Sequence, residues 1–486
     1  MRFRDFAAFH EAVSFPQALL GPGMDRTDRP DLFKSYPEAE TIVLDWSPPE
    51  PRPLDEVLAG RCAPDPQLSL GGLAQVLLCA YGLTRREAGL GWEHWYRTVA
   101  SAGALYPAEL YVAAIGLPGL GDGLHHLDTS RPALSRLRSG DCTAELARAA
   151  GLEPGGLWFV LTGVFHRSAW KYGPRAFRYV LLDVGHLLES LCQSLAARGL
   201  APRTALRFDQ AALDELLGLD PEREACLAAV RAEAPGPAGG GGAGGAGLPG
   251  DRLRRSSRTA RRDGPWEEIV SVCRATAAGR EPRGGIGPAD LGLAPGSRRP
   301  VSRQALPRET LEYPAAVLRR RSRRDFASEP LEPARLNALL SLLGPGTGSA
   351  PQPVVPLLLT QRAGDLADGL HILDLDLPAT ALVRPGQFFR DMAAACLDQA
   401  WMGRANLCLA LVTDFPALER EWGQAGYRAA HLAAGRLGQR FYVAATALGL
   451  GCCGVGAFLD HSVRKLLGLP PGGRLLFVLA AGRVKE

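Results

Sequence analysis

Hydrophobic positions along the chain predict the same order of helices and strands twice. In the first half, a helix at 73–81 is followed by strands at 109–115 and 158–163, a long helix at 179–198 and a strand at 226–230. The second half repeats this order, with a helix at 331–343, strands at 354–360 and 406–413, a helix at 428–447 and a strand at 475–481. Helices and strands alternate without a regular βαβ unit, so we expect an α+β fold in each half.

Short strings recur between the halves and indicate an internal repeat. The string GLHHLD at 123–128 matches GLHILD at 369–374, and LLGL at 216–219 recurs at 466–469. The second pair is offset by 466 − 216 = 250 residues, and this offset also aligns the two long predicted helices. A register held over such a length predicts two copies of one domain.

A segment poor in apolar side chains separates the copies. Residues 233–264 are rich first in glycine and then in arginine, a composition typical of a linker. The predicted organisation is an N-terminal arm at 1–54, a first domain at 55–232, a linker and connector at 233–305, and a second domain at 306–486.

The charge balance and composition of the chain argue against nucleic acid and membranes as binding partners. The 55 Lys and Arg residues nearly balance 51 Asp and Glu residues, so the net charge of +4 gives no strong field for nucleic acid or an anionic membrane. No apolar window reaches the ~20 residues of a membrane helix, and the first residues do not resemble a secretory signal. We therefore expect a cytoplasmic protein that binds neither nucleic acid nor a membrane.

The cysteines and histidines show no metal or disulfide pattern. Ten cysteines occur without a CxxC pair, and nine histidines without an HExxH spacing. We expect no metal site, and cysteines that serve mainly as small buried residues.

Two strings in each copy resemble a known family. The first copy carries RTVASAGALYPAELY at 97–111 and KYGPR at 171–175. This combination resembles the SagB-type dehydrogenases, a branch of the FMN-dependent nitroreductase superfamily that includes thiazoline and oxazoline oxidases of ribosomal peptide biosynthesis. The second copy carries RRSRRDF at 320–326 and LGLGCCGVGAF at 448–458, which resemble the phosphate-binding start and the late glycine loop of that superfamily. The resemblance implies two tandem nitroreductase-like domains, each a mostly antiparallel sheet flanked by helices, paired as an intramolecular pseudodimer.

The second copy holds candidate phosphate ligands. Arginine side chains and backbone amides beside a helix start suit a phosphate monoester such as that of FMN, although a solvated basic run is the alternative. Glycines let backbone amides approach a ligand closely, although a helix C-cap with a turn is again an alternative. The resemblance adds a basic residue at the end of the last strand. The candidates are Arg320, Arg321, Ser322, Arg324, Gly451, Cys452, Cys453, Gly454 and Arg483.

The first copy holds candidate ring contacts and a candidate base. The resemblance assigns Arg97, Ser101, Ala102 and Gly103 to flavin contacts, whereas the string alone is typical of a turn before a strand. Ala100 stands where the family often has proline.

Lys171 and Tyr172 match the Lys-Tyr pair to which the family's azoline oxidation is attributed. Aromatising a thiazoline sends a hydride to the flavin and a proton to a nearby base, and a positioned amine or phenol can take that proton. The alternative is an exposed lysine beside a packed tyrosine.

Each copy lacks the motifs that the other copy carries. The first has EVLAGRC at 56–62 where the second has its arginines. The second has PQPVVP at 351–356 in place of SAGALYP, and Glu421 and Trp422 in place of Lys171 and Tyr172. Because nitroreductase-like dimers build each FMN site from both protomers, we expect one FMN per chain, held by motifs from both copies.

Three functions follow from this resemblance. The leading hypothesis is an FMN-dependent SagB-like dehydrogenase that oxidises azolines in a modified peptide, with a peptide or small-molecule substrate and peptide-modifying partner enzymes. The second is an NAD(P)H-dependent nitroreductase or ene-type reductase. The third, of another class, is a flavin-binding scaffold subunit of a peptide-modifying complex.

Overall fold

The computed structural model describes residues 2–15, 24–64, 68–89, 92–233, 247–279, 281–302, 305–344 and 351–485. The chain divides into two compact units. Unit 1 comprises Met1–Phe9, Gly21–Glu50 and Gly60–Ala278, and unit 2 comprises His10–Leu20, Pro51–Ala59 and Gly279–Glu486. The glycine-rich part of the expected linker, 234–246, lies outside the described residues.

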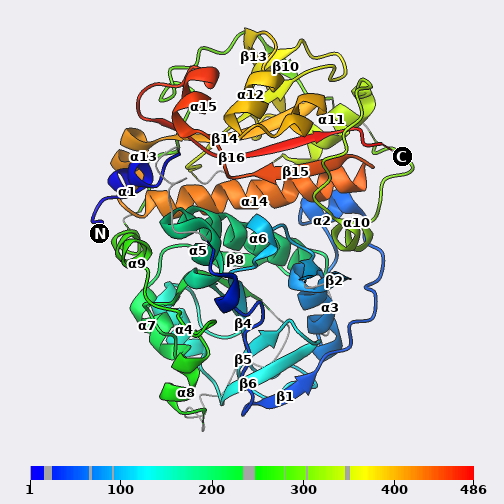
Figure 1. The fold of residues 1–486 in the computed structure, drawn as a ribbon. Coiled ribbons are helices and arrows are strands. Elements are labelled where there is room, and N and C mark those ends of the chain that lie inside the picture. Colours follow the sequence, from blue (N-terminus) through cyan, green and yellow to red (C-terminus); the bar gives the residue numbers. More distant parts are fainter. Residues whose placement is uncertain are drawn as a thin grey trace. The chain divides into compact units, whose positions relative to one another are not determined.

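Unit 1 is built on a seven-stranded antiparallel sheet (Figure 1). From one edge to the other its strands are β1 (Glu40–Val43), β6 (Ala133–Ser139), β5 (Gly123–Asp128), β4 (Ala108–Ala114), β7 (Leu157–Val164), β9 (Glu224–Ala232) and β8 (Pro202–Ala205). A separate hairpin joins β2 (Leu83–Gly89) to β3 (Trp92–Arg97). The helices of this unit are α3 (Leu70–Tyr81), α4 (Thr143–Ala150), α5 (Phe165–Tyr172), α6 (Ala176–Ala196), α7 (Gln210–Leu216), α8 (Gly250–Arg255) and α9 (Glu267–Ala275).

Unit 2 has a sheet of the same size and order. Its strands, in the same direction across the sheet, are β10 (Arg298–Pro300), β13 (Ala379–Pro385), β12 (Gly369–Asp374), β11 (Val355–Thr360), β14 (Leu407–Asp414), β16 (Gly473–Gly482) and β15 (Gly451–Val455). Its helices are α2 (Leu54–Leu58), α10 (Tyr313–Arg319), α11 (Pro333–Leu342), α12 (Phe389–Ala395), α13 (Phe415–Trp422), α14 (Gly426–Ala447) and α15 (Asp460–Leu467). Helix α1 covers Phe6–Ala12.

The two units are copies of one fold, as the repeated strings predict. Strands β7 and β14, and helices α5 and α13, begin and end 250 residues apart. Both helices end at a glycine with a left-handed φ, +56° at Gly173 and +65° at Gly423. The α+β fold with two antiparallel, helix-flanked sheets is therefore confirmed.

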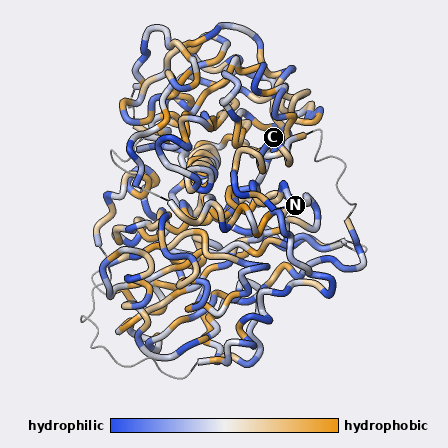
Figure 2. The backbone as a smooth tube through the Cα atoms, turned by 90° about the vertical axis from the view of Figure 1, so that its left-hand side faces the viewer, coloured by the Kyte–Doolittle hydropathy of each residue, from blue (hydrophilic) through white to orange (hydrophobic). Residues whose placement is uncertain are grey.

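In unit 1 the long helix α6 packs on the sheet, and a further buried apolar cluster joins the sheet to helices α4 and α7. Figure 2 shows hydrophobic and hydrophilic segments alternating along the backbone. Helix α6 packs on α3 and on β4, β7 and β9, and nearly all of its residues are buried. Its polar residues Asp183, His186 and Glu189 are buried with it. The helix therefore carries ionisable groups into the interior, next to the loop described below.

The arginine-rich half of the expected linker is packed on unit 1. Gly247 forms a β-bridge with Arg138, and α8 follows. Ser257 is buried and donates a 2.6 Å hydrogen bond to Glu224, while Asp263 accepts one of 2.7 Å from the backbone of Thr259. Buried hydrogen bonds, together with Leu248 and Leu253, which pack against the core of unit 1, hold residues 247–264 on that unit, which differs from a free linker.

A short segment that precedes the first domain in sequence packs with unit 2. The Arg440 guanidinium donates a 2.6 Å hydrogen bond to the carbonyl of Leu58, and Tyr313 N–H donates to the carbonyl of Arg52 at 2.9 Å. The predicted boundary at 54/55 therefore falls inside a segment, Pro51–Ala59, that belongs with the other copy.

All ten cysteines are free, and all except Cys62 are buried, which confirms their expected role as small interior residues. Within the described ranges, no helix combines the length and apolar character needed to cross a bilayer.

Candidate functional site

The SAGALYP loop of unit 1 has an unusual backbone. It links β3 to β4 through a 3-10 turn at Ala102–Ala104. Gly103, Ala104 and Tyr106 adopt left-handed φ angles of 67°, 53° and 46°. Such angles are costly for residues with a Cβ, and they persist where surrounding contacts enforce them.

Asp183 of α6 supplies those contacts. Its carboxylate accepts a hydrogen bond from the Ser101 hydroxyl and another, at 3.3 Å, from the backbone N–H of Ala102. The same serine oxygen accepts the backbone N–H of Tyr106 at 2.9 Å. The hydroxyl of Ser101 therefore donates inward to Asp183, so this side chain fixes the shape of the loop.

Sequence reasoning missed Asp183, although a signal was present. It is a carboxylate on a largely apolar helix that also carries Glu189, and the residue 250 positions after Asp183 is Ala433. Burial raises the pKa of Asp183 to about 7, against the opposing effect of its hydrogen bonds from Ser101 and Ala102.

This raised pKa gives a testable pH dependence of stability. The folded state holds a proton on Asp183 between about pH 4 and pH 7 that the unfolded state has released, so the free energy of unfolding should fall as pH rises through this window. The slope is at most about 1.4 kcal/mol per pH unit. Asp183→Asn should flatten it in denaturant titrations, whereas exposed Asp391→Asn should keep it. Equal slopes in the Asp183→Asn variant and the unmodified protein would refute this assignment.

Lys171 and Tyr172 lie against the same loop. They end α5, and Gly173 terminates the helix. A Cβ placed on Gly103 would come within 2.7 Å of the Tyr172 hydroxyl and 3.2 Å of the Lys171 amine. The structure thus brings the polar ends of the pair directly onto the loop, and any side chain at position 103 would displace them.

The pKa values of Lys171 and Tyr172 are shifted in opposite directions, which suits the two side chains to different acid–base roles. Lys171 is an exposed residue, but partial burial of its amine lowers its pKa, and no carboxylate of the described residues pairs with it. Burial raises the pKa of Tyr172, with further contributions from Tyr179 and Asp183. A lysine with a lowered pKa yields a neutral amine more readily, whereas the tyrosine keeps its proton. The amine is therefore the better proton acceptor of the two.

Arg97 lies in a different environment from Gly103. Its side chain is 1% exposed, and its guanidinium carbon is 4.3 Å from the ring centre of Tyr81 and 4.8 Å from that of Tyr106. It also donates to the carbonyl of Leu32 at 3.2 Å. These contacts stabilise the base of the loop, and a direct ligand contact by Arg97 stays a prediction.

In unit 2 the arginine string and the glycine string lie side by side. Ser322 forms a parallel β-bridge with Cys452, and Arg323 N–H donates to the Cys452 carbonyl at 2.9 Å. Tyr442 of α14 joins both strings, because its hydroxyl lies 2.9 Å from Ser322 Oγ and accepts the Gly454 N–H at 2.6 Å. Residues that are far apart in sequence therefore form one cluster.

The glycine string is a strand, not the expected loop. Residues Gly451–Val455 form the edge strand β15, paired with β16. A Cβ on Gly451 would lie 2.2 Å from Val484, and one on Gly454 would lie 2.4 Å from the Phe477 ring. The glycines thus permit close packing, and the side chains of Cys452 and Cys453 are buried.

The arginines beside this strand are candidates for binding a phosphate. Arg320 is 2% exposed and lies 5.3 Å from the Tyr442 ring centre, while Arg324 is exposed and lies 5.8 Å from the Trp401 ring centre. No carboxylate of the described residues pairs with Arg324. Arg321 donates to the carbonyl of Arg320 at 2.6 Å.

Arg483 of the last strand is engaged with a carboxylate. Its guanidinium forms a 2.9 Å ion pair with Glu332, and both side chains are partly exposed. Its backbone N–H donates to Asn406 at 3.1 Å. The charge of Arg483 is thus partly balanced already, so Arg320, Arg321 and Arg324 are the stronger candidates for an anion.

Comparisons with known proteins identify the family of the chain. The profile of the nitroreductase family matches residues 63–231 and again 317–483. The chain therefore belongs to the nitroreductase family of oxidoreductases. A Methanocaldococcus jannaschii protein named as a nitroreductase, MJ1384, is 30% identical over 156 residues, which are 31% of this chain and 74% of that protein.

Two further relatives extend the comparison. The trifolitoxin-processing protein TfxB of Rhizobium leguminosarum is 27% identical over 147 residues, which cover 28% of this chain and 39% of that protein. A crystal structure of an Anabaena variabilis protein named as a nitroreductase superposes with a TM-score of 0.79 at 24% identity and covers 99% of both chains. The second comparison supports the fold of the whole tandem chain.

Proposed function

We propose that the chain is an FMN-dependent oxidoreductase of the SagB type that oxidises azoline rings in a modified peptide. The observation that carries this proposal is the position of the Lys171 amine and the Tyr172 hydroxyl against Gly103. A base and a hydrogen-bond donor that share one small-residue loop suit the removal of a proton beside a flat ring system.

The two units supply different parts of the proposed FMN site. Arg320, Arg321 and Arg324, with Ser322, would hold the phosphate, and the Ser101–Gly103 loop would contact the ring. Bound FMN supplies hydride acceptance. Lys171 takes the proton from the azoline carbon, Tyr172 donates a hydrogen bond to the substrate, and Asp183 keeps the loop in shape.

The comparisons favour a role in natural-product processing but keep an alternative. TfxB is named for the processing of trifolitoxin, and its similarity supports a role in the processing of a natural product. MJ1384 is named as a nitroreductase, which supports an NAD(P)H-dependent reductase as the second candidate. The assembled Lys171–Tyr172–Gly103 arrangement speaks against a scaffold without catalysis.

Anaerobic reduction of the flavin separates these functions. The purified chain, loaded with FMN, is mixed with a thiazoline-containing peptide, and the flavin absorbance is followed. We expect bleaching by the thiazoline peptide and none by the matching thiazole peptide or by NAD(P)H. Bleaching by NAD(P)H with turnover of a nitroaromatic would instead establish the reductase, and no bleaching by either would favour the scaffold.

A further inference from the structure

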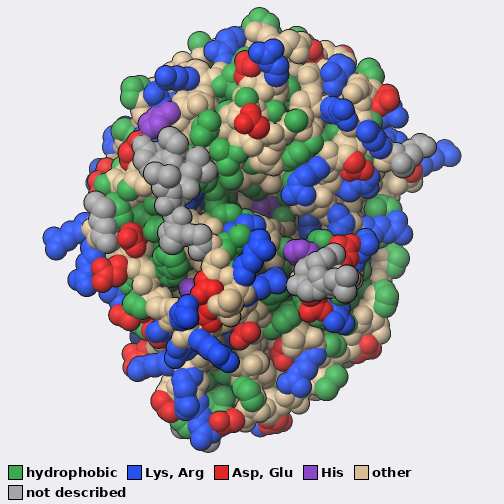
Figure 3. All heavy atoms as spheres, in the orientation of Figure 1, with side chains coloured by type: hydrophobic (Ala, Val, Ile, Leu, Met, Phe, Trp, Pro, Cys, Tyr) green, Lys and Arg blue, Asp and Glu red, His purple; other side chains and the backbone are tan. Residues whose placement is uncertain are grey.

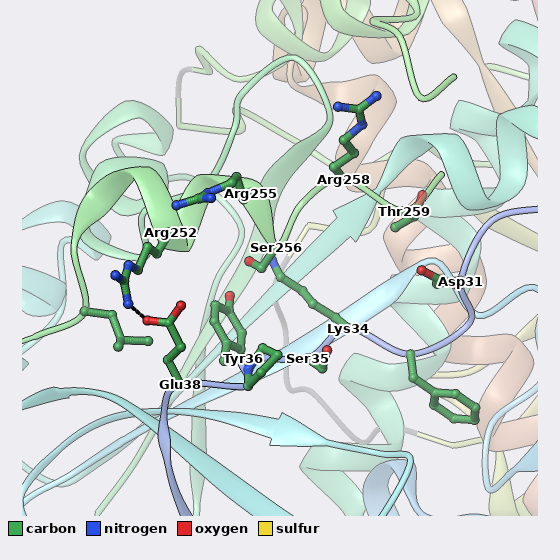
Figure 4. Close-up of a pocket in the computed structure, with 13 residues that line it drawn as sticks. Asp31, Lys34, Ser35, Tyr36, Glu38, Arg252, Arg255, Ser256, Arg258 and Thr259 are labelled. Carbon is green, nitrogen blue, oxygen red and sulfur yellow. Dashed lines mark ion pairs between the residues drawn. The ribbon is translucent and has the colours of Figure 1, made fainter. Parts of the chain in front are cut away.

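A groove in unit 1 is lined by the arginine-rich segment and the N-terminal arm. One of its two pockets has a volume of about 310 Å³ and lies between residues 31–38 of the arm and α8 with the loop that follows (Figure 4). A second pocket of about 760 Å³ shares Asp31, Arg255, Arg258 and Thr259 with the first. The two pockets are therefore adjacent, and together they are called the groove. Figure 3 shows Lys and Arg side chains gathered over the part of the surface where Figure 1 draws α8.

The walls of the groove are held by defined contacts. Asp28 of the arm accepts the backbone N–H groups of Arg261 and Arg262, at 3.0 and 2.7 Å. Beneath them, the buried amine of Lys34 pairs with Glu224 and donates to Tyr111 at 2.7 Å. These bonds position the arginine-rich loop over the arm, so the groove is built in advance of any ligand.

Some arginines along the groove form ion pairs with carboxylates, and others do not. Arg252 pairs with Glu38, and Arg255 forms an exposed ion pair with Asp251 at 2.9 Å. Arg258 is exposed and donates to backbone carbonyls, among them that of Ala260 at 3.1 Å. No carboxylate of the described residues pairs with Arg258 or with exposed Arg261. The groove therefore has cationic groups to offer an anionic partner.

The spacing of these groups indicates an extended partner. Figure 4 shows the guanidinium ends of Arg255 and Arg258 directed apart, so they do not converge on one small anion. Apolar surface from Phe33, Tyr36 and Leu248 lines the same pocket. Alternating cationic and apolar contacts suit a peptide that carries separated carboxylates and apolar side chains.

The groove adjoins the helix that carries the candidate base. The Arg167 guanidinium of α5 donates to the carbonyl of Asp31 at 2.9 Å, and the Trp170 indole donates to that of Asp25 at 2.8 Å. Lys171 is the next residue of α5. The arm segment that lines the groove is therefore anchored on this helix.

We propose that this groove docks an acidic segment of the peptide substrate. The identity of that peptide as a substrate rests on the proposed function, but the docking site itself rests on the groove. Docking raises the local concentration of the reacting ring without changing the chemical step, so it strengthens substrate binding rather than catalysis.

Fluorescence anisotropy on the full chain tests this proposal. The probe is a short fluorescein-labelled peptide that repeats Glu-Leu-Ser, compared with its Gln-Leu-Ser counterpart. We expect the glutamate probe to bind at least about tenfold more tightly than the glutamine probe at low salt, and salt to reduce the difference. The double variant Arg255→Glu and Arg258→Glu should lose at least about tenfold in affinity, while Arg283→Glu with Arg390→Glu, an equal charge change on exposed residues of unit 2, should not.

Several outcomes would overturn the docking site. These are equal binding of the two probes, no binding of either, equal loss in the control variant, or equally tight binding of a single-stranded oligonucleotide of the same charge. The glutamate-to-glutamine comparison uses the unmodified protein and so does not depend on the folding of a variant. FMN content and flavin bleaching by a small free thiazoline are measured in parallel. If they persist while the probes fail, the docking site is wrong and the proposed function stands.

Discussion

Production of the chain as two fragments, cut within residues 234–246, is expected to leave neither fragment able to bind FMN and to restore binding when they are co-expressed. The candidate ring contacts and base belong to the first fragment, and the candidate phosphate ligands to the second. The cut leaves residues 247–264 intact. These residues pack on unit 1 but become part of the second fragment. Bound flavin in each purified fragment and in the mixture is measured by absorbance.

Controls separate loss of the site from loss of the fold. Residues 51–59 belong to unit 2 and residues 247–278 to unit 1, so each fragment alone also lacks part of its packing. Co-expressed fragments with Gly103→Val in the first, or Arg324→Ala in the second, should associate but stay colourless. A second fragment that binds FMN by itself would show that unit 2 suffices.

Lys171→Ala is expected to keep FMN and to lose turnover by about a hundredfold or more, the usual effect of removing a general base. The amine of this exposed residue is the group with the lowered pKa next to Gly103. Turnover in the unmodified chain should rise with pH through a pKa below the usual lysine range, and this limb should vanish in the variant. The measurement is thiazoline turnover against pH, normalised to bound flavin.

Tyr172→Phe should lower turnover less than Lys171→Ala and keep the pH limb, because the tyrosine stays protonated. Matched controls are Lys465→Ala, an exposed lysine of unit 2, and Tyr96→Phe, which removes a hydroxyl bonded to Glu87. Unchanged turnover in both site variants would remove the pair from the mechanism.

The sequence predicts the parts of this fold that depend on regular patterns. Helices α6 and α14 are long apolar segments, and the repeated strings align them, so their existence and equivalence follow from the sequence. The sequence does not predict strand β15, because its glycines and cysteines have little strand preference. It forms because β16 supplies its backbone partners.

Polar contacts over long sequence separations were also beyond sequence reasoning. The bond from Ser101 to Asp183 joins a loop to a helix 82 residues away, and no periodicity marks it. The packing of 247–264 depends on single buried hydrogen bonds, such as that from Ser257 to Glu224, and on two leucines that contact the core of unit 1. By contrast, the proximity of Lys171 and Tyr172 to Gly103 was expected from the family resemblance and is seen in the structure.

The number of flavins per chain tests the central claim most directly. A second site would need its ring contacts at Pro353 and Val354, but both are buried, Pro353 has no N–H, and its carbonyl already accepts a bond from Thr413 at 2.8 Å. Lost charge-assisted bonds of about 1.5–3 kcal/mol each would weaken such a site severely.

The measurement denatures an FMN-saturated, desalted sample and compares released FMN with protein determined by amino-acid analysis. The account predicts a ratio near one that falls in both Gly103→Val and Arg324→Ala. A ratio near two, or a ratio near one that only one of these variants lowers, would contradict a single FMN held by both copies.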